Sequence, residues 1–535
     1  MTSVDSGACE RASVKTVTFR SILFGDAGTP EEIDTVTPPD CFSDLNLDQI
    51  AAALTAGRDE YNLKPFFFYP LTDLYTVNYR YDVQKDLENE TIRGHIQAFA
   101  QKMQAMRGGL AQSAKMHYKL QRQRWFLDAV DHYCSAVLAL RDDLASAGPS
   151  SRGLRDFRDY LTGYTDTAGF VALVADTQRL KDQLASIRYS LRIAGKRIYV
   201  SKYGGESNYS AEVLQVFEKF KQAEANEYRF NLRVPLEMNH VEAGILDLVA
   251  LLFPEVFDFL EKYSLDHAGF LDPVIAKFDR EIQFYVACLE YVSRFKAAGL
   301  PFCYPDVSSK SKQVKCDEAF DLALANRLLG EGAAVVTNDF YLRDPERILV
   351  VSGPNSGGKT TFARTFGQLH YLASIGCPVP ARKAALFLCD RLFTHFEREE
   401  DLQNLSGKLE DELRRIRQIL ERATPMSILI MNESFLSTTL DDASYLSRQV
   451  MERIIVKDMI CVSVTFLDEL ASLGETTVSM VSTVAPHDPA SRTFKIIRRP
   501  ADGLAYAAAI AEKHGLTYEG ISRRLQQTTS ESTVS

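Results

Sequence analysis

The sequence predicts a mainly α-helical region followed by an α/β domain with a mostly parallel sheet. Three observations predict this arrangement. Apolar residues recur about every 3.6 positions over residues 83–147, which is the period of an α-helix. From about residue 331, short β-branched runs alternate with helical segments. Between one of these runs and the helix after it lies a glycine-rich loop with the pattern G-x-x-x-x-G-K-[ST].

The length and composition indicate a globular protein of more than one domain. The chain has 535 residues, of which 46% are hydrophobic and 25% are charged. Nine cysteines without a C-x-x-C pair favour reduced core thiols in a cytoplasmic protein. The formal net charge is −10, so any contact with nucleic acid requires a local basic surface.

We expect no membrane partner. The first residues of the chain lack the apolar stretch of a signal peptide. The longest apolar segment, Ala243 to Leu260, contains Pro254 and three acidic residues. It therefore predicts a buried helix pair and not a membrane span.

The N-terminal half is predicted in this order. Residues 1–46 form a partly ordered segment with one short strand, Val17 to Phe24. Residues 47–330 form the helical region, which begins with a short helix at Asp48 and includes an aromatic core segment at Phe66 to Tyr69. Long helices are expected over residues 83–147, 154–186 and 237–298.

One β insertion, near residues 187–234, interrupts the helices. Apolar and polar residues alternate on both sides of a turn at Ala194 to Lys196, which predicts a β-hairpin, and Tyr228 to Val234 predicts a third strand. The hairpin carries basic residues and no acidic ones: Arg188, Arg192, Lys196, Arg197 and Lys202. Such residues can contact DNA phosphates without sequence preference, but a charge run is more commonly a solvated face, and both interpretations stay open.

The α/β domain is predicted at residues 331–525, before a disordered polar tail at 526–535. Four apolar runs predict its strands: Ile348 to Val351, Ile428 to Met431, Ile460 to Val464 and Val478 to Val484.

The glycine-rich loop follows the first of these strands and precedes a helix predicted from Phe362 to Ser374. This arrangement points several backbone N–H groups at one place, which suits a phosphate group. Lys359 is expected to reach the β- and γ-phosphates of ATP, and the Thr360 hydroxyl to ligate Mg²⁺. The whole loop is predicted to contact the nucleotide: Gly353, Pro354, Asn355, Ser356, Gly357, Gly358, Lys359, Thr360 and Thr361.

The second strand ends in Asn432-Glu433, where ATPases with such a loop carry two acidic residues. We predict that Glu433 polarises the attacking water. Asn432 is neutral and is predicted to hold the metal shell by hydrogen bonding only, so hydrolysis should be slow. Lys359, Asn432 and Glu433 are the predicted catalytic residues, and Thr360 and Asn432 the metal-shell residues.

These motifs resemble those of the MutS family of DNA mismatch-repair ATPases. That family's loop reads G-P-N-M-G-G-K-S-T, where this chain has G-P-N-S-G-G-K-T-T, and an I-G-x-x-V-P-A turn follows it in both. The resemblance covers about residues 335 to 520. It continues through these segments: Asp390 to Thr394, Glu400 to Leu402, Ala423 to Ser427, Glu433 to Ala443, and Tyr506 to Gly515.

The resemblance implies an ABC-type P-loop ATPase domain that closes with a helix–turn–helix at a homodimer interface. It implies that residues 47–330 are a helical core and lever and that the basic hairpin is a DNA clamp. It also implies that Val336 and Asn338 lie beside the adenine, with Arg498 stacking on it. Ser406 would touch the nucleotide of the partner subunit, although it equally suits an N-cap of the helix from Lys408.

The chain departs from the family pattern in ways that bear on function. Beyond Asn432, Phe466 follows Thr465 where the family usually has histidine, and Ser434 to Ser437 replace a glycine-rich segment. Too few residues precede Asp48 to hold the family's mismatch-reading domain, so a short MutS-related ATPase is expected. Two functions stay open: a DNA-binding ATPase in repair or a related DNA transaction, and an ATP-dependent dimeric scaffold that binds a protein partner with little hydrolysis.

Overall fold

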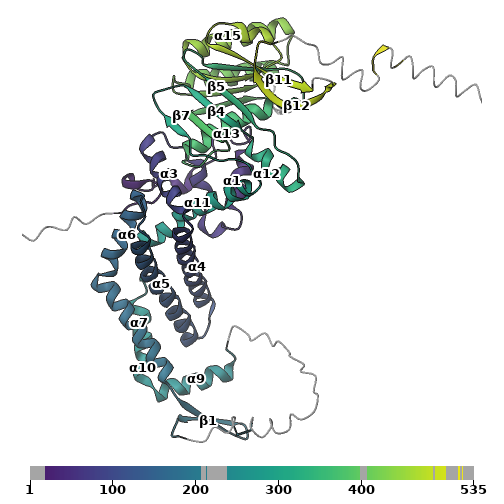
Figure 1. Ribbon diagram of the computed structural model, residues 1–535. Coiled ribbons are helices and arrows are strands. Elements are labelled where there is room, and N and C mark those ends of the chain that lie inside the picture. Colours follow the sequence, from purple (N-terminus) through teal and green to yellow (C-terminus); the bar gives the residue numbers. More distant parts are fainter. Residues whose placement is uncertain are drawn as a thin grey trace, which may run out of the picture. The chain divides into compact units, whose positions relative to one another are not determined.

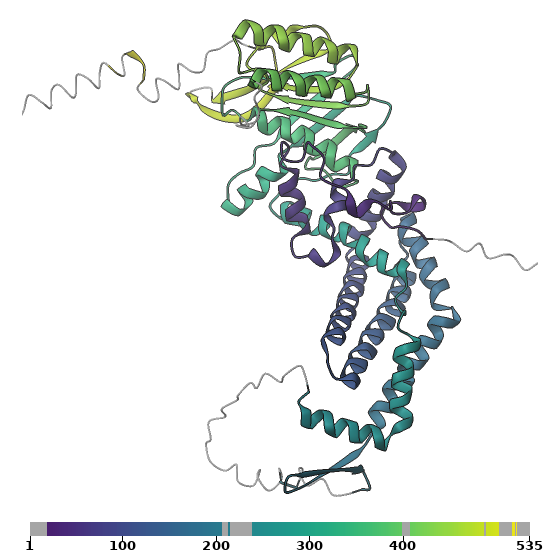
Figure 2. The same cartoon turned by 180° about the vertical axis from the view of Figure 1, so that it is seen from behind.

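The computed structural model describes residues 19–205, 212–213, 238–397, 407–485, 488–501, 516–518 and 521 (Figures 1 and 2). It divides into two compact units. Unit 1 comprises Met1–Phe19, Asn89–Ser150 and Leu154–Asp279, and unit 2 comprises Arg20–Glu88, Ser151–Gly153 and Arg280–Ser535. The domain boundaries expected near residues 46 and 330 remain predictions.

Unit 1 is built mainly from helices. α4 and α5 lie side by side in Figures 1 and 2. The apolar residues Ile92, Ile96, Phe99, Met103 and Met106 of α4 recur at helical spacing and are buried, which gives the pair its core. The helices of this part are α4 (Glu90–Lys115), α5 (Lys119–Ala147), α6 (Arg152–Thr165), α7 (Ala168–Ser186), α9 (His240–Leu252), α10 (Pro254–Asp266) and α11 (Pro273–Ala297), of which α6 and α11 extend into unit 2.

The predicted hairpin is confirmed. β1 (Tyr189–Ala194) pairs antiparallel with β2 (Arg197–Lys202), and Gly195 has the positive φ of 62° that the tight turn needs. The third strand expected at Tyr228 to Val234 lies outside the described residues.

The apolar segment from Ala243 to Leu260 forms two helices, because Pro254 starts α10. The expectation that both helices are buried is wrong, since Leu248 and Leu251 of α9 are exposed. None of the helices in the described part of the chain is long and apolar enough to cross a membrane.

Unit 2 contains a six-stranded sheet, and all four predicted strands are confirmed within it. The strand order is β12-β11-β6-β10-β9-β8. All neighbouring pairs are parallel except the edge strand β12, which runs antiparallel to β11. The strands are β6 (Ile348–Ser352), β8 (Leu392–Phe396), β9 (Ile428–Asn432), β10 (Ile460–Val464), β11 (Thr477–Ala485) and β12 (Asp488–Arg498).

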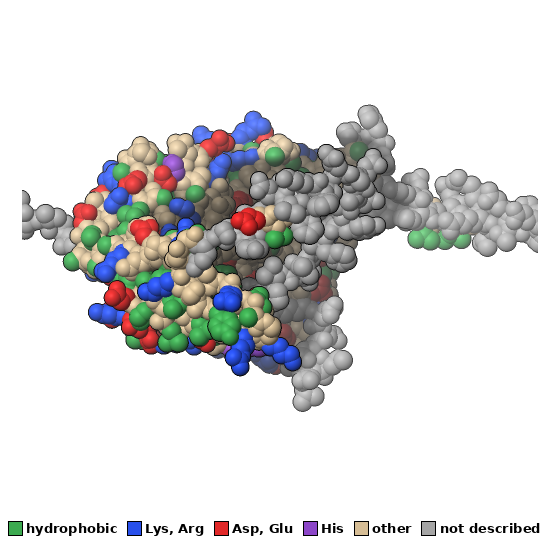
Figure 3. Space-filling view, turned by 90° about the horizontal axis from the view of Figure 1, so that it is seen from below, with side chains coloured by type: hydrophobic (Ala, Val, Ile, Leu, Met, Phe, Trp, Pro, Cys, Tyr) green, Lys and Arg blue, Asp and Glu red, His purple; other side chains and the backbone are tan. Residues whose placement is uncertain are grey.

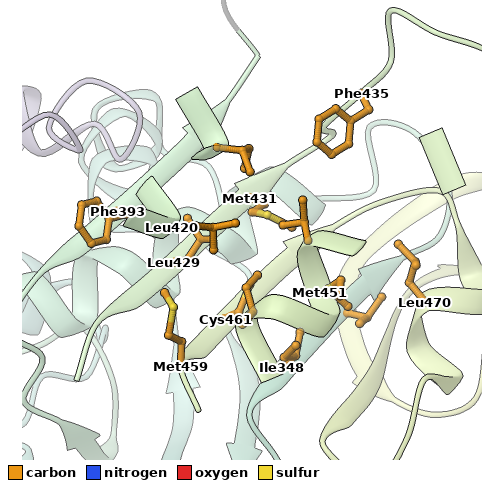
Figure 4. Packing of buried hydrophobic residues seen from close by; sticks show 14 of the residues in the cluster. Ile348, Phe393, Leu420, Leu429, Met431, Phe435, Met451, Met459, Cys461 and Leu470 are labelled. Atoms are coloured by element: carbon orange, nitrogen blue, oxygen red, sulfur yellow. The ribbon is translucent and has the colours of Figure 1, made fainter. Parts of the chain in front are cut away.

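Successive strand residues point to opposite faces of the sheet. Because the central strands are apolar along their length, both faces are covered by helices. On one face, α14 (Lys408–Arg422) and α15 (Leu440–Val456) pack on β6, β9 and β10 in the cluster of Figure 4. Leu429 and Met431 contribute from β9. On the other face, α13 (Lys359–Ser374) meets Ile430 at Gly367, where an added Cβ would lie 2.7 Å from the Ile430 Cδ1.

A second, four-stranded mixed sheet was not predicted. Its order is β3-β7-β4-β5, with β3 (Asp306–Ser308), β4 (Val314–Ala319), β5 (Asn338–Leu342) and β7 (Lys383–Phe387). β4 carries Lys315, Asp317 and Glu318, and β7 begins at Lys383, so these strands lack the continuous apolar run that identifies the others.

The remaining helices of unit 2 are shorter. These are α1 (Leu47–Thr55), α2 (Lys64–Phe68), α3 (Leu74–Glu88), α12 (Leu322–Glu331), and the 3-10 helices η1 (Gly25–Ala27), η2 (Ile33–Thr35), η3 (Asp59–Tyr61) and η4 (Asp468–Ser472). Phe66 and Phe67 are buried, as predicted. The eight cysteines of the described part are free, and seven of them are buried.

The strand expected at Val17 to Phe24 is wrong over its described residues, 19–24, which form a turn before η1. The Glu281 carboxylate accepts hydrogen bonds from the Ser21 hydroxyl at 2.8 Å and the Ile22 N–H at 2.9 Å. The backbone therefore finds its partner in a side chain of α11, which no local pattern reveals.

Candidate functional site

The glycine-rich loop lies between β6 and α13, as the sequence predicts. Gly353, Ser356 and Gly358 have positive φ angles of 116°, 58° and 90°. Gly357 is tightly enclosed, because an added Cβ would lie 2.3 Å from the Ser482 Oγ. The Ser482 hydroxyl donates a hydrogen bond to the Gly357 carbonyl at 2.7 Å, so β11 holds the loop in place.

Lys359 is buried at the start of α13. Its Nζ donates to the carbonyl oxygens of Gly353 at 3.0 Å and Pro354 at 3.3 Å, and lies 3.8 Å from the Glu433 Oε1. Burial lowers the pKa of Lys359, and the neighbouring Glu433 carboxylate opposes that effect. The loop thus holds the Lys359 ammonium group through hydrogen bonds to carbonyl oxygens, and the oxygens of a phosphate group can replace those acceptors.

Thr360 and Asn432 meet in the predicted metal shell. The Thr360 hydroxyl donates to the Asn432 Oδ1 at 2.9 Å, and Asn432 is the last residue of β9. A hydroxyl and an amide oxygen are ligands that Mg²⁺ accepts when phosphate oxygens and waters complete its shell. The described residues contain no cluster of three or more His, Cys, Asp or Glu that could hold a metal ion alone. The donors present therefore fit a magnesium ion shared with a nucleotide.

Glu433 begins a strained turn that a buried acid holds. Glu433 and Phe435 have positive φ angles of 52° and 64°, which is uncommon for residues with side chains. The Glu433 N–H donates to the Val464 carbonyl at 2.9 Å. The Phe435 N–H donates to the Glu412 Oε2 at 2.9 Å, and burial raises the pKa of Glu412. α14 therefore fixes the turn that carries Glu433.

A cavity of about 450 Å³ opens beside the loop. Its walls come from α12, the segment before β5, the loop and β12: Leu324, Arg327, Leu328, Ala334, Val336, Asn338, Ser356, Gly357, Gly358, Lys359, Thr360, Thr361, Glu433 and Phe494. Phe494 is 48% exposed, with a φ of 58°, and lies within van der Waals distance of a Cβ added at Gly358. Sequence reasoning missed Phe494, because a single aromatic residue in an edge strand carries no local signal.

The three residues expected at the adenine are placed differently. Val336 lines the cavity. Asn338 also lines it, but its amide donates to the Phe494 carbonyl at 3.2 Å and accepts from the Ile496 N–H at 2.7 Å. Asn338 therefore ties β5 to β12.

Arg498 is not among the residues that line the cavity, and its stacking on the base stays a prediction. It forms an ion pair with Glu346, and its guanidinium carbon lies 4.4 Å from the centre of the Tyr341 ring. The expected trans-acting Ser406 and the closing segment Tyr506 to Gly515 lie outside the described residues.

The hairpin separates its basic residues between two faces. The register pairs Arg192 with Tyr199 and Ala194 with Arg197, so Arg188, Arg192 and Arg197 share one face. Lys202 pairs with Tyr189 on the opposite, apolar face, where its Nζ lies 5.1 Å from the centre of the Phe253 ring. Lys196 is in the turn. On the described surface seen from below, basic side chains lie beside hydrophobic ones (Figure 3).

Comparison with known proteins finds similarity to MutS and MutS2 proteins. A family model described as MutS domain V matches residues 349–523. The endonuclease MutS2 of Thermus thermophilus is 31% identical over 191 residues, which are 35% of this chain and 25% of that protein. The DNA mismatch repair protein MutS of Thermotoga neapolitana is 33% identical over 138 residues, or 26% of this chain and 17% of that protein.

A longer match is to the DNA mismatch repair protein MutS of Chlorobium chlorochromatii. It is 24% identical over 386 residues, which are 69% of this chain and 43% of that protein. The chain therefore spans less than half the length of each of these relatives. The phosphate-binding loop, the strand-end pair Asn432-Glu433 and these matches together support membership of the MutS family, with residues 349–523 matching MutS domain V.

Proposed function

We propose that this chain is an ATPase that binds DNA. In this proposal it couples ATP binding and hydrolysis to rearrangement of a dimer and its clamp, in DNA repair or a related DNA transaction. The observation that carries the proposal is the contact between loop and strand end. Thr360 bonds Asn432 at 2.9 Å and Lys359 lies 3.8 Å from Glu433, so the groups for phosphate, metal and water meet at one place.

Each residue of this arrangement has a role that follows from its position. Lys359 exchanges its bonds to loop carbonyls for bonds to the β- and γ-phosphates, and the loop N–H groups receive the remaining phosphate oxygens. Mg²⁺, when bound, supplies positive charge beside the phosphates. Thr360 and Asn432 hold its shell, and Glu433 accepts a hydrogen bond from the attacking water.

The adenine base of ATP binds in the apolar part of the cavity beside the loop. Phe494 offers a half-exposed ring there, and Val336 faces the same space. A planar base and an aromatic ring stack favourably, so Phe494 also stacks on the base in this proposal.

A phosphate-release assay tests the proposal. The purified chain is expected to hydrolyse ATP slowly with Mg²⁺ and at a changed rate with duplex DNA. Glu433→Gln should abolish turnover and leave ATP binding intact, because the amide cannot accept the proton of the water but keeps the shape of the side chain. Turnover that survives this change would rule out Glu433 as the water-activating residue.

A second candidate function is an ATP-dependent dimeric scaffold that binds a protein partner with little or no hydrolysis. Two observations favour it. Asn432 brings no charge to the metal shell, and Phe466, just after β10, is 47% exposed where the family resemblance implies histidine. ATP binding with no phosphate release, at any DNA concentration, would favour this function.

Asn432→Asp separates the two functions further. It restores a formal negative charge beside the metal position, and the expected gain in turnover is about tenfold, or about 1.4 kcal/mol in the barrier. A gain indicates that the missing charge limits an existing hydrolysis reaction. No gain, with Mg²⁺ and ATP bound, indicates a scaffold.

A further inference from the structure

Unit 2 contains a second cavity, of about 560 Å³, which residues of α14 help to line. We propose that it binds a small anionic ligand with an apolar body, a phosphate ester or a carboxylic acid, and that its occupancy changes the rate of ATP turnover. Binding of the ligand to this cavity does not depend on the proposed function, whereas the effect on the rate of ATP turnover rests on it. The cavity is lined by residues 37–41, Pro70, Tyr371, Ser374, residues 389–394, Arg415, Gln418, Ile419 and Arg422.

The charge of the lining favours an anion. Three guanidinium groups line the cavity, from Arg391, Arg415 and Arg422. The Asp390 carboxylate already accepts hydrogen bonds from the hydroxyl groups of Thr424 at 2.7 Å and Ser427 at 2.8 Å. Asp40 also lines the cavity, so three guanidinium groups face two carboxylates and the lining keeps one net positive charge.

Two of these guanidinium groups remain available to a ligand. Arg391 forms no ion pair with any residue that the structure describes. Arg422 lies 4.0 Å from the Asp40 carboxylate, and the Asp40 side chain is 90% exposed, so this pair is weak. Arginine forks bind phosphate and carboxylate groups through paired N–H bonds, which these two residues can offer.

The rest of the lining favours an apolar body of small-molecule size. Pro38, Pro39, Pro70 and Ile419 contribute apolar surface, and Phe393 lies beneath the Arg422 guanidinium, 5.6 Å from its ring centre. Small-molecule sites typically measure about 300–1,000 Å³ and combine apolar walls with a few polar groups. This cavity meets both criteria.

α14 joins this cavity to the catalytic turn. Arg415 and Arg422 face the cavity, while Glu412, one turn earlier on the same helix, holds the Phe435 N–H two residues after Glu433. The Arg415 Nη2 also donates to the carbonyl of Phe396, the last residue of β8, at 2.9 Å. The preceding residue, His395, contacts the Ser434 Oγ at 3.0 Å. A ligand that fixes α14 therefore fixes the turn that orients Glu433.

The binding test uses 8-anilinonaphthalene-1-sulfonate, an aromatic anion that becomes fluorescent in apolar surroundings, on the full chain. The variant R391Q/R422Q should weaken its tightest binding phase by about tenfold or more, because it removes two charge-assisted hydrogen-bond donors. The matched control is R414Q/R417Q, which removes the same charge from the exposed side of α14, where both arginines pair with glutamates. Equal binding by R391Q/R422Q and this control overturns the proposal.

Competition identifies the ligand class. Displacement of the dye from the wild-type chain by inorganic phosphate indicates a phosphate ester, and displacement by citrate alone indicates a carboxylic acid. If neither anion displaces it, the site does not select anions and the proposal fails.

The rate effect is measured separately. Saturation with the dye should change phosphate release from the wild-type chain at least about twofold and leave R391Q/R422Q unchanged. Dye binding without any change in the rate overturns the coupling alone. A wild-type chain that releases no phosphate defeats the proposed function, while the binding result still decides whether the site exists.

Discussion

The phosphate-binding loop and the basic hairpin carry their functional groups in opposite ways. In the loop, the backbone conformation and buried partners hold the functional groups in place. Ser482 encloses Gly357, and the Lys359 side chain donates hydrogen bonds to loop carbonyls. In the hairpin, most basic side chains project into solvent from two strands with few neighbours. A site built into the backbone is recognisable before any ligand binds, whereas the role of a solvated surface is decided by its partner.

The largest expected effect tests the fixed side of this comparison. Lys359→Met keeps the length of the buried side chain and removes its charge. ATP binding with Mg²⁺, measured by calorimetry, should weaken by about a hundredfold or more, because the variant cannot form a charge-assisted hydrogen bond to phosphate. Lys408→Met, which removes an exposed partner of Glu397, is the control and should bind ATP normally. Equal affinities would show that the loop does not bind phosphate through Lys359.

The second prediction concerns pH and the helix behind the loop. His370 of α13 is buried, and burial lowers its pKa from 6.5 to about 4. The folded protein keeps the ring neutral, while the unfolded chain takes up a proton below pH 6.5. The contribution of His370 to the free energy of unfolding is therefore complete above pH 6.5, and it is lost as the pH falls toward 4. The loss is on the order of 3 kcal/mol.

Urea unfolding between pH 7 and 4 measures this contribution. The variant His370→Gln cannot titrate and should lose less stability over that range than the wild type, while the exposed His117→Gln should follow the wild type. Parallel curves for wild type and His370→Gln would show that His370 is not the group that titrates.

The third prediction sharpens the link between α14 and the catalytic turn. Glu412→Ala leaves the buried Phe435 N–H without an acceptor, which should cost about 1–3 kcal/mol of unfolding free energy and slow phosphate release. Glu412→Gln keeps an oxygen at the same place and should retain most of both. Glu410→Ala, on the exposed side of α14, serves as the control. A normal rate in Glu412→Ala would mean that the turn positions Glu433 unaided.

The smallest effect is expected on the hairpin and tests its division into faces. Changing Arg188, Arg192 and Arg197 to Gln should reduce the salt dependence of DNA binding, by a slope of about 1 for each phosphate that is no longer neutralised. Lys202→Gln should change the slope little, because Lys202 packs on Phe253. Fluorescence anisotropy with duplex DNA over a salt series measures both. DNA binding that is unaltered by the triple change would remove the hairpin from the DNA interface.

The fold was predictable where local pattern and tertiary environment agree. The strands β6, β9 and β10 are buried on both faces and read as apolar runs, whereas β11 is only partly buried and was found from its recurring valines. The four-stranded sheet was missed because charged residues interrupt strands that are only partly covered. The N-terminal turn was mistaken for a strand because its hydrogen-bond partner, Glu281, lies far away in the sequence.

The candidate site divides in the same way. Residues 353–361 and 432–433 are two short segments whose order and spacing define their chemistry, so they were predicted directly. Phe494, Glu412 and Ser482 come from other elements, and only packing brings them to the loop. The ion pair of Arg498 with Glu346 could not be predicted, because most of the α/β domain separates the two residues in the sequence.

The sequence alone determined the resemblance to the MutS family, the phosphate-binding loop and the parallel strands, because each depends on a short run of residues that can be read locally. Tertiary structure alone decided which face of the hairpin carries the arginines, which aromatic ring lines the cavity beside the loop, and that α14 lines a second cavity. Those properties depend on interactions between residues distant in the chain, and the free energy of such interactions is set by the packed whole.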